Sequence, residues 1–253
     1  MSDPFSIPLG RRDLLAATGS AAAFAMLAAS PFGALAQGAG TAQVKIATIG
    51  SGREGGALGT VFAKAGHPVM FSSRHPEQLK DLVSGAGPNA KAGTVAEAVA
   101  FADVVLLVVP YGAIEEIGRE HGTALAQKPL VIDVSNPIPQ RDGEELVKKV
   151  NEAGGAGLYA AKAIPGAKIV RAFNNFGSAN LTANAGNKDK NGVPMAGDDK
   201  AAIALAEKLV REIGFEPVLI GGLAMGKYVV PTPPMRGEHS PDEIRKIASE
   251  LKA

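Results

Sequence analysis

A glycine-rich segment near the start of the chain carries the clearest chemical signal. Residues 44–56 read V-K-I-A-T-I-G-S-G-R-E-G-G, and Gly50, Gly52 and Gly55 have the spacing of a dinucleotide-binding turn. The first glycine allows a sharp bend from strand to helix, the second lets backbone N–H groups approach a pyrophosphate, and the third lets the helix pack closely on the strand. We therefore expect a nucleotide pyrophosphate at the positive end of a helix.

The sequence around the turn supplies the elements that this motif requires. Residues 44–49 form a short apolar run, as expected of a buried parallel strand. Apolar residues then recur at helical spacing up to Gly66, and a second apolar run follows at 69–71. A chain with 31 glycines places some of them at this spacing by chance, so the alternative is a merely glycine-rich turn. The strand, turn, helix and strand order favours the dinucleotide site.

The end of the second strand distinguishes NADP from NAD. An acid there would bind the ribose hydroxyls of NAD, whereas an arginine accommodates the 2'-phosphate of NADP. Ser73 offers a hydroxyl donor, Arg74 offers a guanidinium fork, and no acid occurs before Glu77. The alternative is that Arg74 is an ordinary solvated arginine at the start of a helix. The pattern favours NADP.

Residues 1–36 have the order of a twin-arginine (Tat) export signal. Arg11 and Arg12 precede an alanine-rich apolar stretch, and the small residues at 34–36 match a cleavage site. A retained membrane anchor is the weaker alternative, because the stretch is short and polar residues interrupt it. We expect a mature chain that begins near Gln37, has no stable membrane span and is periplasmic or otherwise exported, with its cofactor loaded before export.

Composition limits the other classes of function. The 253 residues carry a formal net charge of +1 and are 46% hydrophobic, as in an ordinary globular protein without a nucleic-acid-binding surface. The absence of cysteine excludes disulfides, a thiol nucleophile and a cysteine metal site. The four histidines, which are His67, His75, His121 and His239, have no ligand spacing, so we expect no metal site.

Alternating strand and helix patterns predict an α/β fold. Buried strands are expected at residues 103–110, 130–134, 168–173 and 215–220, and a helix at 200–213. Such alternation is typical of a Rossmann-type, doubly wound and mostly parallel sheet. We assign residues 43–221 to an NADP-binding domain with a small C-terminal α/β elaboration. Residues 222–253 are assigned to a tail whose terminal helix begins after Ser240.

Ligands of such sheets bind outside the carboxyl ends of the strands. Pro110 ends the strand at 103–110 and Tyr111 and Gly112 follow it, so all three are expected to line the path of the cofactor. Asn136 follows the next strand and is positioned to hydrogen-bond the nicotinamide carboxamide or a substrate carbonyl. Asn136 precedes a proline, however, and Asn-Pro is also a common turn dipeptide, so both interpretations stay open.

Six motifs give the chain a family resemblance. In chain order they are I-G-S-G-R-E-G-G-A-L at 49–58, S-S-R-H-P at 72–76, D-V-V-L-L-V-V-P-Y at 103–111, V-I-D-V-S-N-P at 131–137, R-A-F-N-N at 171–175 and M-A-G-D-D at 195–199. In their order and spacing, residues 44–220 resemble the coenzyme F420-dependent NADP oxidoreductase family. An export signal is unusual for that family, and the tail matches no pattern of substrate residues.

The resemblance implies roles for several residues. The glycine turn with Ser51, Arg53 and Glu54 would hold the pyrophosphate, and Ser73 with Arg74 the 2'-phosphate. The nicotinamide ribose would lie between two further residues, Val109 and Pro110. Members of the family also reduce flavins or form the reductase domain of membrane metalloreductases.

The expected function is an NADP(H)-dependent oxidoreductase that transfers hydride between nicotinamide and a deazaflavin (F420) or flavin-like small molecule. Stacked rings need orientation rather than a general acid. A small imine or carbonyl reductase is the alternative enzyme, and it needs a proton donor, for which Tyr111 and Lys162 are the candidates. A non-catalytic NADP-binding redox module is the other alternative. The terminal helix is expected to dock either on its own domain or on a second subunit, which would form a homodimer.

Overall fold

The protein was analysed as a computed structural model, which describes residues 43–187 and 191–252. The described residues belong to one compact unit, Gln43–Ala253. The predicted export signal at residues 1–36 lies outside them.

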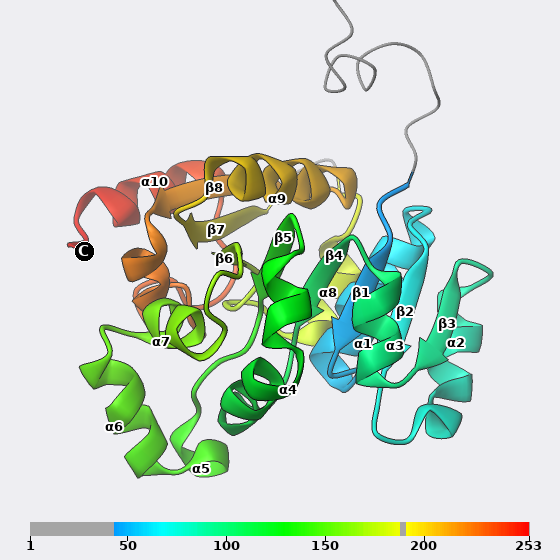
Figure 1. The fold of residues 1–253 in the computed structure, drawn as a ribbon. Helices are drawn as coiled ribbons and strands as arrows, with labels where there is room; N and C mark the ends of the chain where they lie inside the picture. The colour runs from blue at the N-terminus through cyan, green and yellow to red at the C-terminus, as the bar shows by residue number, and fades with distance from the viewer. Residues whose placement is uncertain (1–42, 188–190, 253) are drawn as a thin grey trace, which may run out of the picture. The chain divides into compact units, whose positions relative to one another are not determined.

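The centre of the fold is an eight-stranded sheet in the order β3-β2-β1-β4-β5-β6-β7-β8. In Figure 1 the strands run from β3 at one side to β8 at the other. The first six strands are parallel, β7 is antiparallel to β6, and β8 is parallel to β7. Their bounds are β1 Ile46–Ile49, β2 Val69–Ser72, β3 Ala90–Gly93, β4 Val104–Leu107, β5 Leu130–Asp133, β6 Ile169–Arg171, β7 Gly192–Gly197 and β8 Glu216–Gly221. This order confirms the predicted Rossmann-type, mostly parallel sheet.

Helices cover both faces of the sheet because strand residues alternate between two apolar cores. Ile46, Phe71 and Leu106 belong to one core, and Ala47 and Val105 belong to the other. The first core is covered by α1 (Arg53–Lys64), α2 (Lys80–Ala86), α8 (Ser178–Asn184) and α9 (Lys200–Glu212). The second is covered by α3 (Val95–Phe101), α4 (Ile114–Ala126), α6 (Glu144–Glu152) and α7 (Ala156–Ala163). Both faces of the parallel strands are therefore buried, as in other doubly wound sheets.

Local sequence patterns did not predict every element. β3 reads A-K-A-G, which has low β-propensity, and it is held by its pairing with β2. The stretch 183–193 is rich in glycine and asparagine, yet it contains the end of α8 and the start of β7. The order β7 then α9 then β8 forms a short parallel unit that runs opposite to the main sheet. That direction depends on long-range packing, which local patterns do not encode.

The C-terminal segment packs against the sheet. α10 (Pro241–Ser249) begins after Ser240, as predicted, and the Ser240 side chain forms a capping box with Glu243. Ile244 of this helix is buried with Val218 of β8 and Met235 of the preceding segment. Figure 1 shows α10 next to β8. Among the described residues, no helix is long and apolar enough to cross a membrane.

Candidate functional site

The glycine turn connects β1 to α1 and leaves space on one side. Gly50 has φ +93°, and a Cβ atom there would lie 2.1 Å from the Val108 carbonyl oxygen. A Cβ on Gly55 would lie 2.0 Å from the Gly50 carbonyl oxygen, so the helix approaches the strand as closely as predicted. A Cβ on Gly52 meets no atom within 4 Å, and Gly52 caps α1 without a side-chain hydrogen bond. Gly52 and the first residues of α1 line a cavity, so the N-terminus of the helix borders open space, as anion binding requires.

Hydrogen bonds hold the neighbouring strand ends in place. The hydroxyls of Thr48 and Ser51 lie 2.8 Å apart, which ties the turn to β1. Ser135, at the end of β5, donates to the Leu107 carbonyl and accepts from the backbone N–H of Val109, each at 3.1 Å. Ser135 is 2% exposed. The backbone at Val109, next to the turn, is consequently fixed by the neighbouring strand.

Two cavities meet at the glycine turn, at the carboxyl ends of the strands. The first, which we call the Arg74 cavity, measures about 610 Å³, and the second, the Asn175 cavity, about 580 Å³. Both are lined by Gly52, Val109 and Pro110, so they adjoin each other at the turn. Of the other predicted residues, Gly50, Ser51, Ser73 and Arg74 line the Arg74 cavity, and Arg53, Glu54, Gly55 and Asn136 line the Asn175 cavity.

The Arg74 cavity combines polar groups with an apolar wall. The Ser73 hydroxyl oxygen accepts from the backbone N–H of His75 at 3.0 Å, which orients the hydroxyl and leaves its proton available. Arg74 is exposed and makes no ion pair with another described residue. The apolar wall consists of Leu79, Val95 and Ile117. A phosphate at one end and a flat apolar ring at the other fit this lining.

Tyr111 departs from its predicted position. Its side chain is 1% exposed, and its hydroxyl donates to the Ala156 carbonyl at 2.6 Å. Its ring packs on Tyr159, with centroids 5.7 Å apart. Burial raises the pKa of the phenol, so it stays neutral. The prediction that Tyr111 lines the path of the cofactor is therefore corrected: its side chain belongs to the core beneath α4 and α7.

Asn136 lines the Asn175 cavity, but its amide is largely used inside the protein. The Oδ1 atom accepts from Nη2 of Arg171 at 3.2 Å, and Nδ2 donates to the Asn174 carbonyl at 3.0 Å. Its backbone carbonyl accepts from Arg141 at 2.6 Å. One Nδ2 hydrogen is left for a ligand. Asn136 therefore does more than form a turn. Its amide can use only part of its hydrogen-bonding capacity to bind a ligand.

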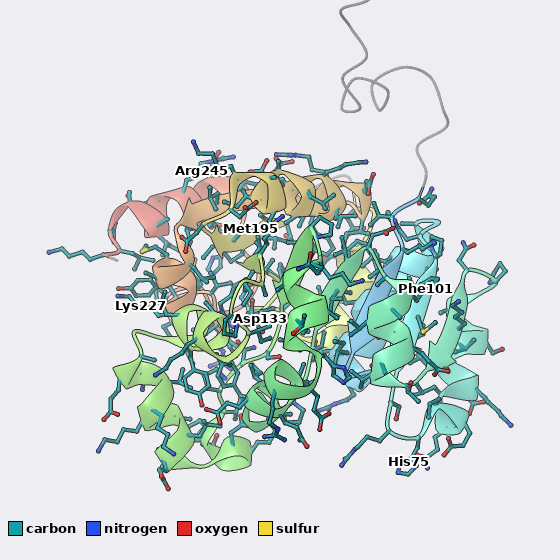
Figure 2. The ribbon with its side chains drawn as sticks, in the orientation of Figure 1. His75, Phe101, Asp133, Met195, Lys227 and Arg245 are labelled. Carbon is teal, nitrogen blue, oxygen red and sulfur yellow. The ribbon has the colours of Figure 1, made fainter. Side chains whose placement is uncertain are left out.

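Arg171 connects this edge of the sheet to the C-terminal segment. Its guanidinium forms a fully buried ion pair with Asp133, and both side chains are 0% exposed. It also donates to the carbonyls of Gly226 at 3.2 Å and Val229 at 2.9 Å. Burial raises the pKa of Asp133, and the guanidinium opposes that shift. Figure 2 shows Asp133 among the central strands. The pair positions the segment after β8 over the Asn175 cavity.

Asn174 and Asn175 line the same cavity, although sequence reasoning gave them no role. Their amide groups donate to the carbonyls of Ser135 at 3.2 Å and Gly237 at 2.8 Å. Both Oδ1 atoms are buried without a partner among the described residues. The preceding residue, Phe173, has φ +66°, which is strained for an aromatic residue. Two asparagines directly after a buried strand were the signal in the sequence.

Comparison with known proteins finds a family model that matches the part of the chain around the glycine turn. Residues 45–137 match the family described as NADP oxidoreductase, coenzyme F420-dependent. This matched segment covers 93 of the 253 residues. It contains the glycine turn, Arg74 and Val109, and it ends directly after Asn136. The resemblance inferred from the six motifs is confirmed for this segment.

Relatives of the F420-dependent oxidoreductase domain extend the match. The F420-dependent NADP reductase of Methanothermobacter thermautotrophicus is 28% identical over 204 residues, which are 76% of this chain and 87% of that protein. Metalloreductase STEAP3 of Rattus norvegicus is 28% identical over 196 residues, or 75% of this chain and 36% of that protein. A crystal structure of a hypothetical protein from Sinorhizobium meliloti has a TM-score of 0.64 at 28% identity and covers 78% of this chain and 96% of that one.

The relatives confirm the predicted enzyme class, an oxidoreductase. The two named proteins are reductases, and the family consists of NADP oxidoreductases. The chain spans about a third of the length of the metalloreductase. The match therefore concerns only that part of the metalloreductase.

Proposed function

We propose that the protein is an NADP(H)-dependent oxidoreductase that transfers hydride between nicotinamide and a deazaflavin or flavin-like acceptor. The observation that carries this proposal is the meeting of the Arg74 and Asn175 cavities at Gly52, Val109 and Pro110. A dinucleotide that crosses the turn has its adenosine in one cavity and its nicotinamide at the mouth of the other. The Asn175 cavity then has room for a second ring system.

The proposed cofactor position uses each part of the site. Arg74 and Ser73 bind the 2'-phosphate, and the adenine lies against the apolar wall of the Arg74 cavity. The open side of Gly52 and the start of α1 receive the pyrophosphate. Val109, held by Ser135, flanks the nicotinamide ribose. We infer NADP rather than NAD because of the guanidinium of Arg74.

The lining of the Asn175 cavity favours a ring acceptor over a carbonyl. When bound, NADPH supplies a hydride from its nicotinamide ring, and the acceptor ring takes that hydride together with one proton from water. Among the described residues, the lining contains no His, Lys or Tyr that could protonate a reduced carbonyl. Of the two predicted proton donors, Tyr111 is buried and Lys162 lines a different cavity with Glu115. What the protein contributes is orientation of the two rings.

An acceptor panel tests the proposal. Full-length protein is mixed with NADPH under anaerobic conditions, separately with a deazaflavin, with FMN, with FAD, with a cyclic imine and without an acceptor. Oxidation of NADPH is expected with at least one of the ring acceptors and not with the imine. Binding of NADPH without oxidation by any acceptor would show a non-catalytic NADP-binding module. Turnover with the imine alone would favour the reductase alternative.

For location, we propose that residues 1–36 direct the folded protein through the twin-arginine route with its cofactor bound. The supporting observation is the order of Arg11-Arg12, apolar stretch and small residues in the sequence. Replacing both arginines by lysine tests it by cell fractionation. The unchanged protein should be found outside the cytoplasmic fraction and the Arg11→Lys/Arg12→Lys variant inside it. Equal distribution of the two proteins would contradict this location.

A further inference from the structure

The segments that follow β4 and β5 form two walls of the proposed nicotinamide site. We call residues 108–111 the β4 wall and residues 134–138 the β5 wall. Val109 and Pro110 of the first and Asn136 and Ile138 of the second line the Asn175 cavity. Hydride transfer requires the nicotinamide ring to be held in a defined position relative to its acceptor. The separation of the two walls therefore matters for the reaction.

The carboxylate of Asp142 joins the two walls. Asp142 ends α5 (Pro139–Asp142), a single helical turn that follows the β5 wall. Its Oδ1 atom accepts from the backbone N–H of Tyr111 at 3.1 Å, and its Oδ2 atom accepts from the backbone N–H of Ile138 at 2.8 Å. Tyr111 lies 31 positions earlier in the chain, so the carboxylate does more than stabilise its own turn. A single side chain thus connects the ends of both walls.

Arg141 strengthens this connection. Its Nε and Nη2 atoms donate to the two oxygens of Asp142 at 3.1 and 2.8 Å, and Nη2 also donates to the Asn136 carbonyl of the β5 wall at 2.6 Å. Burial by itself raises the pKa of the Asp142 carboxyl, but hydrogen bonds from Arg141 and Ile138 lower it below the ordinary value of 3.8. The Asp142 side chain is only 2% exposed. It is therefore a buried carboxylate whose oxygens accept from four donors.

The β4 wall is attached on both sides of Pro110. Before Pro110, the backbone N–H of Val109 donates to the Ser135 hydroxyl at 3.1 Å. After it, the backbone N–H of Tyr111 donates to Asp142. Pro110 itself is exposed in the cavity lining. Ser135 thus fixes the wall up to Val109, and Asp142 fixes the backbone beyond Pro110.

We propose that Asp142, paired with Arg141, is a positioning residue for hydride transfer, because it holds the β4 wall against the β5 wall around the nicotinamide ring. The inference rests on the proposed function and adds to it a residue outside the site. Asp142 is not among the described residues that line the Arg74 or the Asn175 cavity, so it acts through the walls. The affinity for NADPH comes mainly from the phosphate contacts on the other side of the turn. Loss of Asp142 should therefore slow the transfer and leave NADPH binding unchanged.

Asp142→Asn tests the proposal. The amide nitrogen of asparagine cannot accept a hydrogen bond from a backbone N–H, so one wall loses its contact whichever way the amide turns. Full-length protein loaded with NADPH is mixed without oxygen with FMN and, separately, with a deazaflavin, and the rate of a single turnover is measured. The rate should fall about tenfold or more, because a misplacement of about 1 Å can cost about a hundredfold. Fluorescence titration should give the same Kd for NADPH as in the unchanged protein.

Asp103→Asn is the matched control. The Oδ2 atom of Asp103 accepts from the backbone N–H of Lys45 at 3.0 Å, at the amino ends of β1 and β4 and away from both cavities. This variant should keep the rate of transfer. Arg141→Gln is a second test variant, which serves if Asp142→Asn does not fold. It frees the Asn136 carbonyl but keeps both backbone contacts of Asp142, so it should also slow the transfer, to a smaller extent.

Amide hydrogen exchange tests the connection without turnover. The amides of Tyr111 and Ile138 should exchange slowly in the unchanged protein and faster in Asp142→Asn, whereas the Val109 amide should change little. An unchanged transfer rate in the folded variant would overturn the proposal, as would a parallel loss of NADPH affinity or equal exchange in the two proteins. Absence of transfer in the unchanged protein contradicts the proposed function instead. Exchange then still shows whether Asp142 joins the walls, so the two failures can be told apart.

Discussion

Arg74 is the side chain on which the proposed cofactor preference depends. Replacing it with alanine should weaken NADPH binding by about 1–3 kcal/mol, the range for a charge-assisted contact, because the 2'-phosphate loses its partner. NADH lacks that phosphate, so its affinity should hardly change. Fluorescence titration of both nucleotides measures the difference. Arg245→Ala, remote from the Arg74 cavity, is the control. Equal losses for NADPH and NADH would refute this role of Arg74.

Two glycines of the same turn should respond to alanine in different ways. Gly52→Ala adds a methyl group where no protein atom lies within 4 Å, so it should leave thermal stability unchanged and weaken NADPH by occupying the pyrophosphate's space. Gly50→Ala places its methyl group 2.1 Å from the Val108 carbonyl at φ +93°, so it should lower the melting temperature. Thermal unfolding and NADPH titration measure both effects. Normal NADPH affinity in Gly52→Ala would contradict the proposed position of the pyrophosphate beside Gly52.

Most of the candidate site follows from local sequence, because a strand end and a glycine turn fix where the adjacent residues lie. Tyr111 is the exception among the predicted residues. The chain turns into a short 3-10 helix, Tyr111–Ala113, which directs the ring into the core. Asn175 could not be assigned a role, because its partner, Gly237, is remote in sequence. Hydrogen bonds of that separation depend on the completed fold.

The ion pair between Asp133 of β5 and Arg171 of β6 supports the packing of the segment after β8. Arg171→Met leaves Asp133 charged, buried and unpaired, and should lower the free energy of unfolding by about 3–5 kcal/mol. Replacing both partners, in Asp133→Leu/Arg171→Met, removes the buried charge and should recover part of that loss. Chemical denaturation of the unchanged protein, of Arg171→Met, of Asp133→Leu and of the double variant gives the values. Losses that simply add in the double variant would contradict the coupling.

The cap of α10 should give stability a pH dependence. The backbone N–H and hydroxyl of Ser240 both donate to Glu243, at 2.7 and 2.9 Å, and the backbone hydrogen bond is the first cause that lowers the pKa of Glu243. A lowered folded-state pKa gives stability that is present above the unfolded pKa and lost as the pH falls through the folded pKa. Glu243→Gln keeps a neutral capping box.

The melting temperatures of the unchanged protein and of Glu243→Gln should therefore approach each other as the pH falls below the ordinary value of 4.5. Thermal unfolding across that range is the measurement. A difference in melting temperature that stays constant across this pH range would show that the charge of the Glu243 carboxylate does not contribute to the stability that the cap provides.

The elements were predicted best where their patterns are local. Strands β1, β4 and β5 are short, largely apolar runs, and α9 has a clear apolar face. The edge strand β3 has no such pattern, since only its pairing with β2 makes it a strand. The direction of β7 could not be predicted either, because the antiparallel pairing with β6 is a property of the assembled sheet.

On the scale of the whole molecule, the doubly wound order explains why the two cavities adjoin at the glycine turn. β1 and β4 are neighbours although β2 and β3 lie between them in sequence, so the chain leaves the two strands in opposite directions. A crevice opens at that point, beyond the carboxyl ends of the strands. The tail, anchored by Arg171, then closes the far side of the site. Long-range contacts therefore position the residues of the proposed acceptor site, whereas local sequence positions those of the proposed dinucleotide site.

The central claim is the transfer of hydride from NADPH to a ring acceptor, and isotope transfer tests it most directly. Full-length protein is mixed with NADPH deuterated at the transferring position of nicotinamide, and with a deazaflavin or FMN, without oxygen. The account predicts that deuterium leaves the nicotinamide in a single turnover. With the deazaflavin it should appear on the ring, where a carbon-bound hydrogen does not exchange with water. Deuterium that stays on the bound nicotinamide with both acceptors would contradict the account.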